Sequence, residues 1–179
     1  MRSRTILNVL IGVLAVAALS AGLLRWHQTE DEAARVSQTR EAIRLIESEL
    51  RLRAVTGVAE TNARGYAARV DPSWFERLPA NAFVDHRHVW LEIAPESHAE
   101  YDHPPMRIAL DRDTAAFWYN PAKGVVRARV APGVSDRGAI GLYNELNGTS
   151  VATLFDAHWN NTIPVVGTAD AGGVETNVR

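Results

Sequence analysis

Thr5–Leu24, TILNVLIGVLAVAALSAGLL, is the stretch that decides the fold, and it contains no charged residue. At about 1.5 Å per residue, a helix of this length measures about 30 Å, which is enough to cross the hydrocarbon core of a bilayer. After Arg25 the sequence becomes mixed in polarity and rich in charge. We therefore expect a transmembrane anchor over residues 1–27, with the rest of the chain outside the lipid bilayer.

Basic residues set the expected orientation of this anchor. Arg2 and Arg4 precede the apolar stretch, whereas the acidic run 30–32 follows Arg25. By the positive-inside rule, the N-terminus is cytoplasmic and the bulk of the chain is periplasmic or extracellular, held by a single pass in the inner membrane. The alternative is a signal peptide cleaved after the small residues of 18–21, ALSA. The apolar stretch is long for such a peptide, and a helical pattern continues directly beyond it.

Composition limits the possible classes of protein. The chain has 179 residues, so about one ordinary domain follows the anchor. Charged residues make up 22% and hydrophobic residues 46%, which is typical of a folded domain and not of a disordered one. The net charge of -2, without a basic stripe, argues against nucleic acid as a partner. The absence of cysteine excludes disulfides, thiolate nucleophiles and cysteine metal sites.

Residues 28–57 have the pattern of an amphipathic helix that continues the anchor. No proline or glycine lies between Leu23 and Thr56, and Gly57 is suited to end the helix. The apolar positions expected to hold the rest of the domain are Val36, Ile43, Ile46 and Leu50, with Leu45 and Leu52 broadening the face. This face is expected to pack on a sheet further along the chain, and a short coiled-coil stalk is the alternative.

Residues 58–168 are expected to form an α+β head. Asp71-Pro72 starts a short helical turn, since aspartate caps and proline suits the first helical position. The predicted strands are His88–Ala94, Met106–Leu110, Ala115–Tyr119 and Val125–Val130, of which the last two flank the turn Asn120–Gly124. Short connections favour an antiparallel β-meander. Arg107, Arg127 and Arg129 alternate with apolar neighbours, which predicts one solvated face.

A second helix is expected over Arg137–Leu146. Ser135-Asp136 supplies its cap, and Asn147-Gly148 its end. Residues 169–179, with two adjacent glycines, are expected to be a flexible tail.

Three parts of the sequence together resemble the type IV pilin and type II secretion pseudopilin superfamily. Residues 4–13, RTILNVLIGV, are similar to the family's mature start, Phe-Thr-Leu-Ile-Glu followed by apolar residues. The uninterrupted helical pattern to Gly57 is the second part. Residues 118–130, WYNPAKGVVRARV, resemble the Tyr-Asn-Pro-x-x-Gly-x-Val-Arg hairpin of pilin-like exported proteins. Together these parts span much of the chain.

The resemblance implies a long N-terminal helix packed on a small antiparallel meander, and a structural rather than enzymatic role. It also implies that Asn8, Val9, Val13 and Val16 lie in the helix bundle that assembles subunits within the membrane. Asn8 stands where the family has an early glutamate, and no glycine precedes residue 4 as a leader cleavage site. These departures favour a minor, priming or uncleaved subunit, whose partners are other pilin-like subunits or secretion machinery.

Histidines are the residues most suited to a metal site. His86 and His88 are expected on one face of a strand, at a spacing that allows both to bind one ion, and His98, His103 and Asp102 follow in the next loop. Arg87 between the pair, and the scatter of the other ligand types, favour plain solvated histidines. We therefore expect no metal and no cofactor, with His86 and His88 as the weak candidates.

No motif for an enzyme is found. The sequence has neither Gly-x-Ser-x-Gly nor a glycine-rich phosphate loop after a strand. What the resemblance implies is therefore the leading expectation: a membrane-anchored, pilin-like or pseudopilin-like structural subunit of a secretion or pilus-type assembly. A single-pass extracytoplasmic binding or sensor module is the alternative, and a membrane-tethered metalloprotein is a third possibility.

Overall fold

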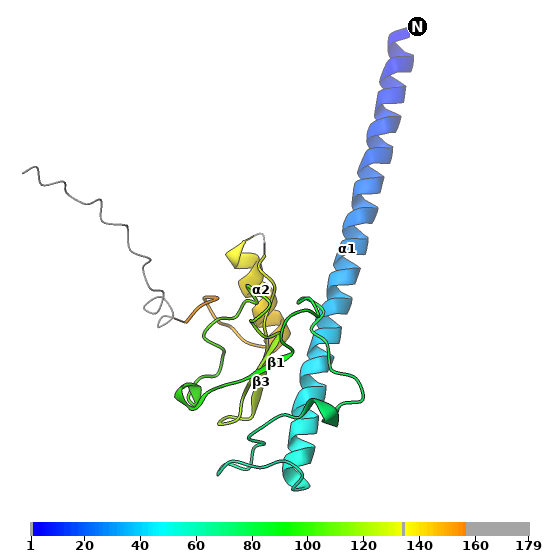
Figure 1. Cartoon of the computed structure of the whole chain (residues 1–179). Helices are drawn as coiled ribbons and strands as arrows, with labels where there is room; N and C mark the ends of the chain where they lie inside the picture. Colours follow the sequence, from blue (N-terminus) through cyan, green and yellow to red (C-terminus); the bar gives the residue numbers. More distant parts are fainter. Residues whose placement is uncertain (1, 134, 157–179) are drawn as a thin grey trace, which may run out of the picture.

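The computed structural model describes residues 2–133 and 135–156, and of residues 2–28 it describes the helical backbone alone. This part of the chain is α+β, as predicted, with two α-helices and a three-stranded sheet. The elements are α1 (Arg2–Val55), a 3-10 turn η1 (Pro72–Trp74), β1 (Leu91–Ile93), a second 3-10 turn η2 (Glu96–His98), β2 (Phe117–Asn120), β3 (Val125–Ala128) and α2 (Asp136–Asn147). The head gathers along the C-terminal part of α1, and the N-terminal part projects beyond it (Figure 1).

The first helix is a single element of 54 residues, which corresponds to about 80 Å. It ends as predicted, because Gly57 adopts a φ of 72° and its amide donates to Ala54 O at 3.3 Å. Among the residues whose side chains are described, no helix is long and apolar enough to span a membrane. The expected anchor, Thr5–Leu24, lies outside that part.

One face of α1 is buried against the head. Val36, Ile43, Ile46 and Leu50 are buried, as the sequence predicts, and Thr39 joins them with no exposed surface. The expectation that Leu45 and Leu52 widen this face is wrong, because they are 48% and 52% exposed. Leu45 follows Ile43 by two residues, and therefore points about 200° further around the helix.

Polar contacts fix the same helix to the main chain of the head. The Arg35 guanidinium donates to Ala82 O at 3.0 and 2.8 Å, and the Thr39 hydroxyl accepts the amide of Ala82 at 3.1 Å. Arg40 donates through Nε to Glu145 O at 3.0 Å, near the C-terminal end of α2. The two arginines therefore bind main-chain carbonyls, of which that of Glu145 belongs to the helix end that lacks intrahelical partners, and Thr39 binds a main-chain amide.

The sheet differs from the predicted antiparallel meander. Its order is β1-β2-β3, with β2 antiparallel to β3 but β1 parallel to β2. Met106–Leu110 is not a strand between β1 and β2. It lies beyond β3, where Ala109 N donates to Val130 O at 2.8 Å and Val130 N donates to Arg107 O at 3.1 Å. The long polar loop after β1 carries the chain to the opposite edge of the sheet, and a parallel pairing requires such a crossover.

The hairpin and the second helix form where the sequence predicts them. The turn between β2 and β3 ends at Gly124, whose φ is 64°. A Cβ at Gly124 would lie 2.4 Å from Cδ1 of Tyr66, so only glycine fits beneath this ring. Ser135 caps α2 by accepting from Gly138 N, and Gly148 ends it with a φ of 62°.

We expect the buried face of α1 to dominate the stability of the head. Ile46 has no exposed surface, so Ile46→Ala is expected to lower the free energy of unfolding by about 2–5 kcal/mol. Leu45→Ala, one residue earlier and half-exposed, is the matched control and should change it by less than about 1 kcal/mol. Urea unfolding followed by tryptophan fluorescence measures both, and equal losses would contradict the packing described.

Candidate functional site

The two faces of the sheet differ in chemistry. Phe117, Tyr119, Val126 and Ala128 belong to the hydrophobic core that includes the buried face of α1. The register pairs Trp118 with both Glu92 and Arg127, so these three side chains share the opposite face. Trp118 has no exposed surface, and its indole Nε1 finds no hydrogen-bond partner in the described part of the chain.

This outer face is covered rather than solvated, which corrects the expectation from the alternating arginines. Arg129 and Arg107 are buried, with 3% and 7% exposure, under the chain that crosses the face after β1. Arg129 donates to Met106 O at 2.9 Å, to Ala115 O at 3.0 Å and to a carboxylate oxygen of Glu92 at 2.6 Å. The buried guanidinium of Arg129 is tolerated because oxygens accept hydrogen bonds from all three of its nitrogens and the carboxylate of Glu92 balances its charge.

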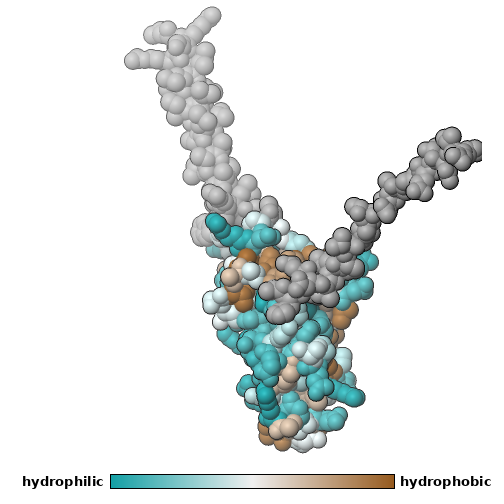
Figure 2. Space-filling model, turned by 90° about the vertical axis from the view of Figure 1, so that its left-hand side faces the viewer, coloured by the Kyte–Doolittle hydropathy of each residue, from teal (hydrophilic) through white to brown (hydrophobic). Residues whose placement is uncertain are grey.

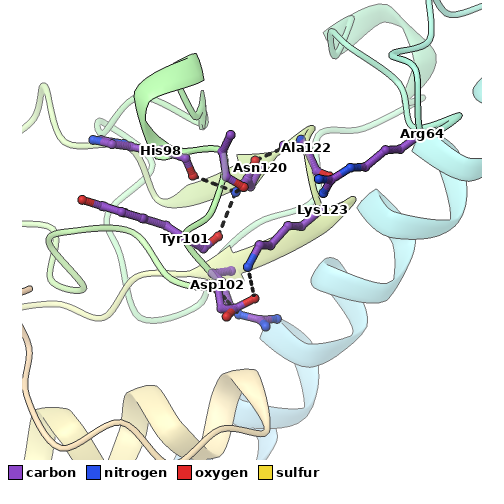
Figure 3. Close-up of polar contacts among 9 residues, drawn as sticks. Arg64, His98, Tyr101, Asp102, Asn120, Ala122 and Lys123 are labelled. Carbon is purple, nitrogen blue, oxygen red and sulfur yellow. Dashed lines mark hydrogen bonds and ion pairs between the residues drawn. The ribbon is translucent and has the colours of Figure 1, made fainter.

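Asn120 organises the loop that crosses this face (Figure 3). Its side chain is buried at the end of β2, and its Nδ2 lies 3.0, 3.2 and 2.8 Å from the carbonyl oxygens of His98, Ala99 and Tyr101. Its Oδ1 accepts the amide of Ala122 at 3.0 Å. One amide therefore joins the crossover loop to the hairpin turn, with both its donor and its acceptor used.

The rim of this hub carries the groups that are available to a partner. The rings of His98 and Tyr101 stack at 4.9 Å between centroids, with an interplanar angle of 8°, and project side by side from the loop (Figure 3). Lys123 Nζ lies 3.0 Å from a carboxylate oxygen of the exposed Asp102. Arg64 donates to Ala122 O at 2.9 Å. The rim therefore offers aromatic faces and charges of both signs, which suits surface recognition.

A second polar pair joins the crossover loop to α2. His103 Nδ1 lies 3.1 Å from the hydroxyl of Tyr143, and the two rings meet edge to face. Burial, with the nearby charges of Arg127 and Arg107, lowers the pKa of His103 from 6.5 to about 4. Burial also raises the pKa of Tyr143. Both side chains are therefore uncharged at pH 7, and their contact joins the crossover loop to α2.

The expected histidine pair lies in a turn and not in a strand. His88 N donates to Asp85 O at 3.0 Å, and β1 begins only at Leu91. The loop histidines His98 and His103 are engaged elsewhere, with Tyr101 and Tyr143 respectively. Within the described residues, no group of three or more histidine, aspartate or glutamate side chains could hold a metal ion.

The predicted assembly residues lie outside the part whose side chains are described: Asn8, Val9, Val13 and Val16. The Asn120 hub was not predicted. In the sequence, Asn120-Pro121 indicates only a turn. The three carbonyls that the Asn120 side chain binds lie about 20 residues away along the chain, at separations that carry no periodic signal.

On the face shown in Figure 2, most of the head is hydrophilic and the hydrophobic areas are small. No protein-family model, curated protein or solved structure matches the chain.

We expect the Asn120 hub to be sensitive to a change of one atom. Asn120→Asp replaces the donating amide nitrogen by an oxygen that faces three carbonyls, so the free energy of unfolding should fall by at least about 2 kcal/mol. Lys123→Ala removes only a partly exposed ion pair and should cost less than about 1 kcal/mol. Urea unfolding compares them, and hydrogen exchange at Ala99–Tyr101 should accelerate only in the aspartate variant.

The neutral His103 should make stability depend on pH. Between pH 6.5 and about 4 the unfolded chain binds a proton at this residue that the folded chain does not, so stability falls as the pH falls through this window. Thermal unfolding at several pH values should show a smaller loss in His103→Gln. Tyr143→Phe keeps the imidazole and should retain the loss. An unchanged pH profile in His103→Gln would contradict this assignment.

Proposed function

We propose that this protein is a membrane-anchored, pilin-like or pseudopilin-like structural subunit of a secretion or pilus-type assembly. The observation that carries the proposal is α1 itself, one helix of 54 residues whose C-terminal part is built into the core of the head. A domain attached through a flexible linker would move independently of its anchor. Here the C-terminal part of the helix that leads toward the N-terminus is itself part of the core of the head.

The attachment of the head to α1 supports this proposal. Hydrophobic burial at Ile43, Ile46 and Leu50 is combined with the contacts of Arg35 and Arg40 to head carbonyls. Together these contacts set how the head is rotated about α1 and where it lies along the helix axis. The position of the helix in a bundle would therefore determine the position of the head surface, as regularly stacked subunits require.

The apolar sequence Thr5–Leu24 supports the proposed place of assembly. In lipid, helices associate through close side-chain packing, which small residues allow. Residues 12–22 of this stretch contain two glycines, four alanines and one serine. We place Val9, Val13 and Val16 in the helix bundle. Asn8 is polar but uncharged, so it would join the bundle through hydrogen bonds without the cost of a buried carboxylate.

The remaining parts of the proposal follow from this placement. The protein would sit in the inner membrane by a single pass, with its N-terminus cytoplasmic and its head periplasmic or extracellular. Its partners would be the lipid bilayer, other pilin-like subunits and secretion machinery. The polar, aromatic rim at His98 and Tyr101 would then face neighbouring heads or a secreted substrate.

Cysteine crosslinking in native membranes tests the assembly. The chain has no cysteine, so Val13→Cys or Val16→Cys introduces a single thiol. Oxidation should give disulfide-linked dimers, or adducts to other pilin-like subunits carrying a cysteine at the matching position. Ser73→Cys, on the exposed turn η1 and outside the rim at His98 and Tyr101, is the control and should give far less product. Recovery of monomer alone from both membrane positions would contradict the proposal.

A further inference from the structure

A hollow of about 410 Å³ lies beside β1, away from the Asn120 hub. Leu78, Pro79, Val84 and Trp90 contribute apolar wall, and Asp85, His86 and His88 contribute its polar side. Both histidines that the sequence analysis singled out therefore border the same hollow. Their ring nitrogens decide what the hollow can bind.

The geometry of His88 fixes its tautomer. Its Nδ1 lies 3.1 Å from the carbonyl oxygen of Thr114. A carbonyl oxygen only accepts hydrogen bonds, so Nδ1 carries the proton. The neutral ring then holds its free lone pair on Nε2, the nitrogen that remains for a ligand.

The geometry of His86 gives the same result by another route. Its Nδ1 lies 3.0 Å from Oδ1 of Asp85. A carboxylate oxygen accepts hydrogen bonds, and the other oxygen of Asp85 already accepts from Arg87 Nε at 2.6 Å, so Nδ1 of His86 is the donor. The side chain of His86 is 93% exposed, which leaves Nε2 open to solvent.

These two hydrogen bonds are the arrangement found around metal-binding histidines. A ligating histidine donates its other ring N–H to a carboxylate or a main-chain carbonyl, which orients the ring and makes the ligating nitrogen more basic. Asp85 supplies the carboxylate and Thr114 the carbonyl. The positive charge of Arg87 beside the pair is balanced, because its guanidinium donates to Oδ2 of Asp85 at 2.6 Å.

We propose that His86 and His88 bind one divalent transition-metal ion of the zinc class through their Nε2 atoms. Imidazole nitrogens favour Zn²⁺, Cu²⁺ and Ni²⁺ over Mg²⁺ and Ca²⁺, which prefer oxygen. With only two protein ligands, the remaining positions of the tetrahedral ion are filled by water. The site is therefore open and exchangeable, and it does not depend on the proposed role in assembly.

Titration calorimetry with Zn²⁺ on the full-length, untagged chain tests this site. We expect one ion per chain that is lost in the double variant H86A/H88A, and a decrease in affinity of about tenfold or more in Asp85→Asn. His98→Ala removes a histidine outside the hollow and should bind as the native chain does. Mg²⁺ should give no binding heat.

Two results would overturn the proposal: no zinc binding by the native chain, or unchanged binding in H86A/H88A. Folding is controlled by thermal unfolding without metal. His86→Ala alters an exposed ring and should leave the unfolding midpoint unchanged, while lowering zinc affinity at least tenfold. This single variant therefore decides the question even if replacement of His88 disturbs its contact with Thr114.

Discussion

Burial of one face of α1 is the constraint on which the rest of the head depends. The sheet is only three strands wide, and its strands are three or four residues long. Such a sheet has too little surface of its own to be stable without a covering element. Ile46, Tyr143, Phe117 and Val126 have no exposed surface, and they come from α1, α2 and two strands. The core therefore exists only when the long helix is in place.

The opposite face of the sheet is closed by polar means. The loop after β1 crosses this face, and Asn120 joins the loop to the sheet. Arg129 donates to the main-chain carbonyls of Met106 and Ala115. Buried polar groups of this kind are costly unless they are satisfied, so they admit few alternative arrangements. The head thus combines an apolar side, where burial supplies stability, with a polar side, where hydrogen bonds select one path for the chain.

Local signals predicted more of this structure than long-range ones. The capped turn at Asp71, the end of α1 at Gly57 and the bounds of α2 were all visible, because capping and turn chemistry act over a few residues. The order of the strands could not be predicted. Polar and apolar residues alternate along Met106–Leu110 as they would in a strand between β1 and β2, but this segment pairs with Val130, on the far side of β3. The prediction of a solvated face at the alternating arginines was wrong for a related reason. Alternation shows which residues share a face, but it does not show that a distant loop covers that face.

The contacts of Arg35 and Arg40 have a consequence for how such heads diversify. Both guanidiniums reach carbonyl oxygens, at Ala82 and Glu145, and Thr39 receives a main-chain amide. Every residue type except proline has the same main-chain groups, so these contacts do not depend on which side chain stands at 82 or 145. Related chains could exchange these head residues freely and keep an identical joint, which leaves natural variation available for the outward surface.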